Sequence, residues 1–256
     1  MHVPYEKPFA DFLRFVADSY GEAEYPEAFI PYIAHKATAG YVIEKFFPEL
    51  QAEFIKRDGE FVYAISEPGW KNSPLNMKSE LRAKSDGTFE LYANKGFVLD
   101  ADLGVFAVKH ESEFALVIVD TDYYRNSRVA LEMPEATYKV GPDKIITHYR
   151  CEFTATLDIV PFRKISKRDI LLLSRAVVFR EQVAYAVLAA AEAAKHHDMS
   201  GLKSRVDLLC QRAKEEPGHD DIAVAREILS AAIVRILAEP NAHGFWKWLS
   251  RFIKPD

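Results

Sequence analysis

Hydrophobic residues recur at helical spacing in the first part of the chain. Within residues 5–20 and 27–46 they return every three or four positions, for example at Phe9, Phe12 and Leu13. This period is typical of helices with one buried face, so the pattern predicts two N-terminal helices.

From residue 61 onward the pattern changes to short runs rich in β-branched and aromatic residues, separated by turns. Between two of these runs, Asp86-Gly87 predicts a two-residue hairpin turn in which both residues have positive φ. Strands at such regular spacing are typical of a β-barrel or sandwich. The predicted strands cover residues 61–65, 80–84, 89–93, 105–109, 114–120, 137–140 and 151–160.

A long helical pattern follows at residues 168–197, which as one helix would measure about 45 Å. Its apolar residues lie nearly all round the helix, which predicts a position inside a bundle or an oligomer interface. Two more helices are predicted at residues 201–215 and 220–238. The expected fold is therefore α+β and multidomain, with a short N-terminal helical part, a middle β-barrel and a C-terminal helical bundle. The expected domains are residues 1–58, 59–163 and 164–256.

Composition narrows the class of protein. Of the 256 residues 49% are hydrophobic and 28% charged, as in a folded globular protein. The formal net charge of -5 gives no general attraction to nucleic acid. Cys151 and Cys210 fall in a predicted strand and a predicted helix, which indicates reduced, buried thiols. Residues 1–15 do not have the pattern of a secretory signal, and we expect a cytoplasmic protein.

The segment Tyr63-Ala64-Ile65-Ser66-Glu67-Pro68-Gly69, within this helix, β and helix order, resembles the entrance to the middle domain of acyl-CoA dehydrogenases. That family has a Thr-Glu-Pro-Gly turn, and Ser66 keeps a hydroxyl at the threonine position. The resemblance covers roughly residues 40–195. It implies the family's fold, FAD as cofactor, an acyl-thioester as ligand and a homo-oligomer.

The resemblance also implies which positions would face the flavin. On the first strand these are Tyr63, Ile65 and Ser66. On a later strand Phe97 takes the place of a tryptophan that packs on the flavin, and Leu99 replaces a threonine whose hydroxyl bonds it. Leucine has no hydrogen to donate, so the altered positions predict that FAD is not retained.

The dehydrogenation needs a carboxylate that removes the substrate α-proton. The chain has no Tyr-Glu-Gly-Thr-like loop of the kind that presents this glutamate in the family. Some members place the base near the start of the first long helix, where this chain has Arg168 and, beside it, Asp169. Asp169 is therefore the candidate base, and its alternative role is a carboxylate that favours the start of a helix.

Two other features were considered. His196, His197 and Asp198 could be metal ligands, but adjacent residues on a helix point about 100° apart, so we expect a solvated helix end and no metal site. The tail at residues 245–254 has the pattern of an amphipathic helix. It is expected either to pack on its own bundle or a sister subunit, or to contact a membrane surface or another protein.

Two functions remain open. In the first, the chain is an acyl-CoA dehydrogenase-like protein with degraded flavin-binding and catalytic-base motifs, and acts as a non-catalytic binding or assembly subunit beside a complete homologue. In the second, it is an FAD-dependent acyl-CoA dehydrogenase with a relocated carboxylate base such as Asp169.

Overall fold

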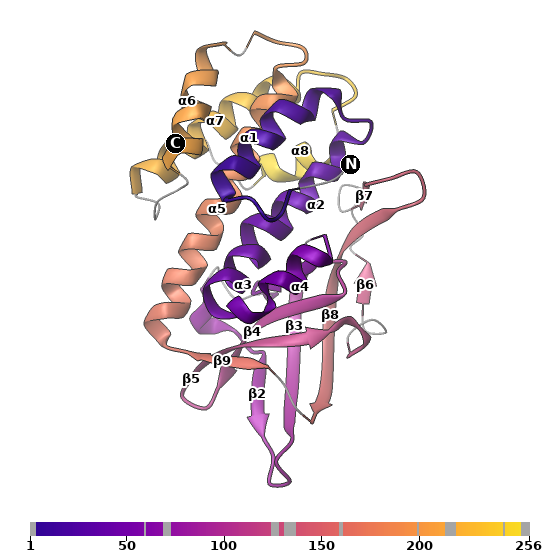
Figure 1. Cartoon of the computed structure of the whole chain (residues 1–256), viewed down its shortest axis with the longest axis vertical. Coiled ribbons are helices and arrows are strands. Elements are labelled where there is room, and N and C mark those ends of the chain that lie inside the picture. Colours follow the sequence, from indigo (N-terminus) through magenta and orange to yellow (C-terminus); the bar gives the residue numbers. More distant parts are fainter. Residues whose placement is uncertain are drawn as a thin grey trace. The chain divides into compact units, whose positions relative to one another are not determined.

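The structure is a computed structural model of the whole chain (Figure 1). It describes residues 4–58, 60–68, 73–123, 128–130, 137–158, 161–198, 200–212, 219–242 and 244–251.

The chain forms two compact units. The helical unit consists of Met1–Ala37, Met133–Ile146 and Ala176–Asp256, and the sheet unit of Thr38–Glu132 and Thr147–Arg175. Each unit therefore combines segments that are distant in sequence. The domain boundaries expected after residues 58 and 163 stay a prediction.

Helices begin and end the chain. They are α1 (Phe9–Ser19), α2 (Phe29–Ala34), α3 (Tyr41–Phe46), α4 (Gln51–Lys56), α5 (Lys167–Ala193), α6 (Ser200–Arg212), α7 (His219–Ile236) and α8 (Gly244–Ser250). A π-helical segment, His35–Gly40, joins α2 to α3, so the helix predicted at residues 27–46 is interrupted rather than regular. None of the described helices has the length and apolar character needed to cross a bilayer.

Within the described part of the chain, nine strands form one sheet. They are β1 (Phe61–Ala64), β2 (Glu80–Ala83), β3 (Phe89–Leu99), β4 (Leu103–His110), β5 (Glu113–Asp120), β6 (Arg128–Ala130), β7 (Thr137–Lys139), β8 (Ile145–Leu157) and β9 (Phe162–Ile165). The strand order is β6-β8-β3-β2-β4-β5-β9, with β1 paired to β4 and β7 to β8. The predicted order of a helical N-terminal part, a central β part and C-terminal helices is confirmed.

The hairpin between β2 and β3 forms where Asp86-Gly87 predicts it, but with a different turn. Gly87 has φ of 85°, whereas Asp86 is not among the residues with positive φ. Lys84 accepts a hydrogen bond from Gly87 N and donates one to Thr88 O, which makes a longer loop that ends in a left-handed glycine. The predicted two-residue turn was therefore wrong, because Asp86 accepts hydrogen bonds from Thr88 and stays in an ordinary conformation.

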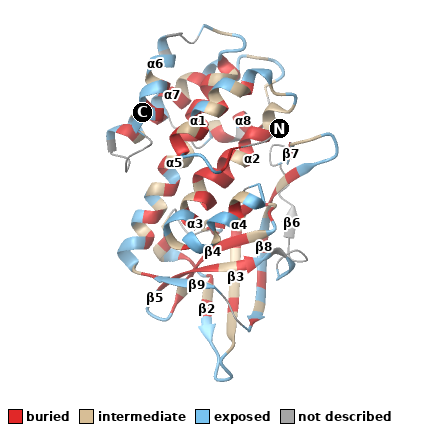
Figure 2. Cartoon of the chain, in the orientation of Figure 1, coloured by how far each residue is buried: buried red, intermediate tan, exposed pale blue. Residues whose placement is uncertain are grey.

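Each unit has its own apolar core (Figure 2). In the helical unit, residues 183–190 of α5 are all buried, in agreement with the all-round apolar pattern. In the sheet unit, Val105–Val108 of β4 are fully buried, and the Phe54 ring of α4 packs edge-on against Phe61 at 5.6 Å. Both cysteines are free and buried, as predicted.

Candidate functional site

Strands β1 and β2 occupy a single position in the sheet. Both run parallel to β4: Phe61–Ala64 pairs with residues 103–106, and the start of β2 with residues 109–110. Because β5 pairs along the other side of β4, β1 and β2 must lie end to end on the same side. Residues 65–79, which contain the Ser-Glu-Pro turn, connect β1 to β2. Neither strand pairs with β4 at Ala107, so there is a break between β1 and β2 at that point.

A buried ion pair closes this break. The Nζ of Lys95 lies 2.9 Å from Oε1 of Glu67 and donates a 2.7 Å hydrogen bond to Ala107 O on β4. The Glu67 carboxylate also accepts hydrogen bonds from the backbone N–H groups of Lys78 and Ser79. These bonds take the place of ladder bonds that a continuous strand would make.

The pair is almost fully removed from water, with side-chain exposures of 0% for Lys95 and 2% for Glu67. Burial alone would raise the pKa of Glu67, but the Lys95 charge and the hydrogen bonds from Ser79 and Lys78 hold that pKa below its ordinary value. Burial lowers the pKa of Lys95, and Glu67 opposes this. These contacts give Glu67 a structural role in the sheet.

Two of the candidate cofactor positions, Ser66 and Phe97, lie close to the same break. Ser66 O accepts a 2.9 Å hydrogen bond from Gly96 N, which brings the end of β1 beside β3 next to Phe97. Leu99 is 4% exposed, whereas Ser66 and Phe97 are half-buried. Gly69, which completes the turn motif, lies outside the described residues.

Phe97 is stacked on a residue that the sequence did not single out. Its ring lies 3.7 Å from that of His148, with the planes 19° apart. His148 is 3% exposed and lies opposite Leu99 in the β3–β8 pairing. No sequence signal could have found this contact, because it depends on a register across some 50 residues that includes a bulge between Lys95 and Val98.

Tyr63 carries an unpaired buried hydroxyl. The residue is 7% exposed, and its hydroxyl oxygen has no hydrogen-bond partner among the described residues. Burial raises the pKa of the Tyr63 phenol, so the group remains an O–H donor. Such unpaired groups are rare in native proteins and call for a physical explanation.

Asp169 forms a helix cap. Its backbone N–H donates a 3.1 Å hydrogen bond to Ser166 Oγ, and the Ser166 hydroxyl donates a 2.6 Å bond to Asp169 Oδ2. Ser166 is therefore the N-cap residue of α5, and the Asp169 carboxylate holds its hydroxyl in place. Asp169 is exposed, and its geometry matches the alternative, structural role given to it above. Its role as a base stays a prediction.

A second carboxylate on α5, that of Glu181, has a raised pKa. Burial raises the pKa of Glu181 to about 7, although the hydrogen bond from Tyr185 lowers it. That bond runs from the Tyr185 hydroxyl to Glu181 Oε1 and measures 3.2 Å. The sequence signal that could have found Glu181 is a single acidic residue within the apolar middle of a long helix.

Known structures share this architecture. A glutaryl-CoA dehydrogenase from Mycobacterium smegmatis, in complex with FADH2, matches 95% of this chain and 75% of its own, with 10% identity and a TM-score of 0.62. Butyryl-CoA dehydrogenase from Megasphaera elsdenii matches 96% and 78%, with 13% identity and a TM-score of 0.63. A variant of the steroid acyl-CoA dehydrogenase Tcur3481-Tcur3483 matches 95% and 77%, with 15% identity and a TM-score of 0.53. The chain has the acyl-CoA dehydrogenase fold. No family model and no curated protein matches the sequence.

In the acyl-CoA dehydrogenase fold of this chain, the ends of β1 and β3 carry the positions that the resemblance assigns to the flavin. Tyr63 has a hydroxyl to donate, and Phe97 supplies an aromatic ring beside Ser66. Leu99 supplies no hydrogen bond, so a ligand there would be held at fewer points than the resemblance implies.

His197, after the end of α5, contacts a carboxylate. His197 Nε2 lies 3.2 Å from Glu239 Oε1, so this ring pairs with α7's end rather than with His196. Among the described residues, no group of three or more His, Cys, Asp or Glu side chains could hold a metal ion. The expected absence of a metal site stays a prediction.

The tail helix α8 packs within the helical unit. Phe245 is fully buried, with its ring 5.3 Å from that of Tyr185 and 6.0 Å from that of Tyr138. Trp246 and Leu249 are also buried. The Trp248 side chain and Phe252, which belong to the predicted apolar face, lie outside the described part. The contacts of α8 match packing on its own bundle, and contact with a membrane surface or another protein stays a prediction.

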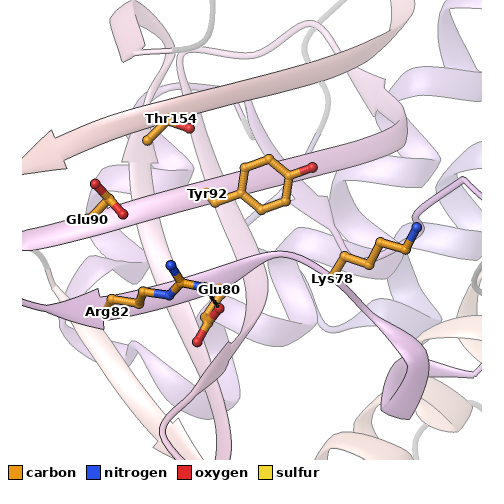
Figure 3. Close-up of a pocket in the computed structure, with 6 residues that line it drawn as sticks. All are labelled: Lys78, Glu80, Arg82, Glu90, Tyr92 and Thr154. Atoms are coloured by element: carbon orange, nitrogen blue, oxygen red, sulfur yellow. Dashed lines mark hydrogen bonds and ion pairs between the residues drawn. The ribbon is translucent and has the colours of Figure 1, made fainter.

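A polar hollow of about 320 Å³ lies on β2, β3 and β8 (Figure 3). It is lined by Lys78, Glu80, Arg82, Glu90, Tyr92 and Thr154. Arg82 pairs with Glu80 at 2.6 Å, and Tyr92 donates a 2.8 Å hydrogen bond to Glu152. Most of the lining residues are paired across neighbouring strands on the solvent-facing side of the sheet. None of the predicted site residues is among them.

Proposed function

We propose that this chain is a non-catalytic member of the acyl-CoA dehydrogenase type, and that it acts through binding or assembly. The observation that carries the proposal is that the residues of the family-like turn serve to hold the sheet together. Glu67 of the family-like turn and its partner Lys95 are both occupied in closing the break between β1 and β2. Folding alone explains why they are present.

The positions that would serve chemistry support the same proposal. Leu99 is a buried residue with nothing to donate. Asp169 is engaged with Ser166 as a helix cap. A protein with these residues keeps the scaffold of the fold, while its grip on a flavin and its base are weakened.

A partner is part of the proposal. One protein of this fold is named for two components, Tcur3481-Tcur3483. We propose that this chain likewise works in an oligomer, either with copies of itself or beside a complete homologue, and that its ligand is an acyl-thioester.

The absorbance spectrum of the purified protein tests the proposal. We expect a colourless protein that does not oxidise butyryl-CoA when an artificial electron acceptor is supplied. A yellow protein with the bands of oxidised flavin, together with turnover of butyryl-CoA, would contradict it.

Glu181 favours a second candidate, an FAD-dependent acyl-CoA dehydrogenase with a relocated base. A bound FAD would supply the hydride acceptor. The chain's own part would be to take the substrate α-proton on the Glu181 carboxylate, whose pKa of about 7 suits a general base at neutral pH. Tyr185 would hold that carboxylate in place.

Exchange of the butyryl-CoA α-proton in D2O tests this second candidate without any need for hydride transfer. A working base gives deuterium at the α-carbon, and Glu181→Gln lowers the exchange rate by about 10² to 10⁴. Asp169→Asn is the matched comparison, because a loss in that variant alone would point to the base named from the sequence. No exchange above the rate in buffer would remove this candidate.

A further inference from the structure

The polar hollow on β2, β3 and β8 lies apart from the positions that the resemblance assigns to a ligand, since none of them is among its described lining residues. Its volume of about 320 Å³ is at the lower end of the range of small-molecule sites. Four of its six lining side chains are charged, two of each sign: Lys78, Arg82, Glu80 and Glu90. A lining with this balance favours neither a simple anion nor a simple cation.

One of these charges, on Glu90, is left without a partner. Glu90 on β3 lies opposite Arg82 on β2, where residues of opposite charge ordinarily pair across the strands. The Arg82 guanidinium instead donates a 2.6 Å hydrogen bond to Glu80, two residues away on its own strand. Among the described residues, the half-buried Glu90 carboxylate makes no hydrogen bond and no ion pair. It has given up part of its hydration, so a cationic group of a ligand would supply the partner that it lacks.

The Lys78 ammonium is the matching cation. Its side chain is exposed, and within the described part of the chain the ammonium has no ion pair or hydrogen bond. Figure 3 shows Lys78 and Glu90 on opposite sides of the Tyr92 ring. The Tyr92 hydroxyl is already bonded to Glu152, so the residue offers its ring, and Thr154 on β8 adds a hydroxyl beside it. The hollow therefore has a free positive charge at one end and a free negative charge at the other.

The strand register gives the separation of the two ends. Glu80 lies opposite Tyr92, so the same antiparallel register, continued by two residues, brings Lys78 level with Asn94. Asn94 and Glu90 are four positions apart on β3, which is about 14 Å along the strand. The lysine side chain is long and flexible, so the distance that a ligand has to bridge between the two charges is several ångströms shorter than this.

We propose that the polar hollow binds a short peptide with free ends, of about two or three residues. Its terminal carboxylate accepts hydrogen bonds from the Lys78 ammonium, and its terminal ammonium donates to the Glu90 carboxylate. An extended tripeptide spans at most about 10 Å, and the lysine side chain covers the remaining distance. A phosphate would be repelled by the two glutamates and a polyamine by the two cations, so a ligand that carries both charges fits best. This inference is independent of the proposed function.

Titration with trialanine, followed through the NMR shifts of the backbone amides of β2 and β3, tests the proposal. We expect a dissociation constant of about 1 mM or below. N-acetyl-trialanine lacks the ammonium and trialanine amide lacks the carboxylate. Each should bind about fivefold more weakly than trialanine, because an ion pair near the surface contributes modestly to affinity.

Two variants show which protein group meets which end of the peptide. Lys78→Met should bind trialanine about fivefold more weakly than the wild type does, but the amide equally well, because that ligand has no carboxylate to lose. Glu90→Gln should likewise weaken the binding of trialanine and leave that of N-acetyl-trialanine unchanged. Lys84→Met is the matched control. The Lys84 ammonium donates to Thr156, outside the hollow, so this variant should bind trialanine as the wild type does.

Three results would overturn the inference. The first is the absence of any shift with trialanine up to about 10 mM. The second is an equal loss of affinity in Lys84→Met and Lys78→Met, which would show a general effect of charge. The third is losses from the ligand and protein changes that simply add, because groups in contact give losses that do not.

Discussion

Replacing Glu181 with glutamine removes a carboxyl group whose proton affinity folding has changed. The pKa rises from its ordinary value of 4.5 to about 7 in the folded protein. The folded state therefore holds a proton that the unfolded state releases between pH 4.5 and 7. The contribution of Glu181 to the free energy of unfolding is fully present below pH 4.5 and is lost as the pH rises through 7.

The size of the effect follows from the shift. A difference of about 2.5 pH units, at 1.36 kcal/mol per unit, gives about 3 kcal/mol, which is an upper value because Glu181 keeps some contact with solvent. Glutamine is close to the protonated glutamate in shape and has no charge to lose. At pH 8 the Glu181→Gln variant should therefore be more stable than the wild type by up to about 3 kcal/mol, and at pH 4.5 nearly equal to it.

Urea unfolding at a series of pH values measures this difference. Trp246, which is 1% exposed in α8, reports on the helical unit through its fluorescence. Tyr185→Phe is a second variant with a predicted sign: it removes a hydrogen bond that lowers the pKa of Glu181, so stability should fall more steeply with pH than in the wild type. Parallel pH profiles for wild type and Glu181→Gln would refute the reasoning.

Three further predictions concern stability and are measured by urea unfolding. Lys95→Met leaves the Glu67 carboxylate buried without its partner and should lower the free energy of unfolding by about 3–5 kcal/mol. Adding Glu67→Gln should make this loss smaller. Additive losses for the two substitutions would contradict a coupled pair. Gly104→Ala would place a Cβ 2.4 Å from a ring carbon of the fully buried Phe106, so we expect a loss of about 1–3 kcal/mol, and an unchanged midpoint would show that the ring can move. Ser166→Ala removes the hydroxyl that caps α5 and should cost about 1 kcal/mol, whereas Ser166→Thr keeps the cap and serves as the control.

Much of the fold could be predicted because periodicity survives in single sequences. The long helix α5 and the strands β4 and β5 have patterns long enough to show their period, and the structure has them within a few residues. The short strands Arg128–Ala130 and Phe162–Ile165 were not predicted from the sequence.

The site was predictable only as far as local motifs reach. The Ser-Glu-Pro turn could be recognised, but its partner Lys95 lies 28 positions away and its task became clear only from the pairing of β1 and β2 with β4. The pKa of Glu181 depends on which side chains surround α5. The contact of Phe97 with His148 depends on strand register.

The sheet is weakest where β1 and β2 lie end to end beside β4. Elsewhere in the sheet, backbone hydrogen bonds join neighbouring strands, and acid leaves these bonds intact. Between β1 and β2, the Glu67 carboxylate makes the connection through its bonds to Ser79 N and Lys95 Nζ. In strong acid Glu67 takes up a proton and the attraction to Lys95 ends. We expect the first opening of the sheet in acid to occur there, with fast amide exchange at Lys78 and Ser79 while the β4–β5 ladder remains protected.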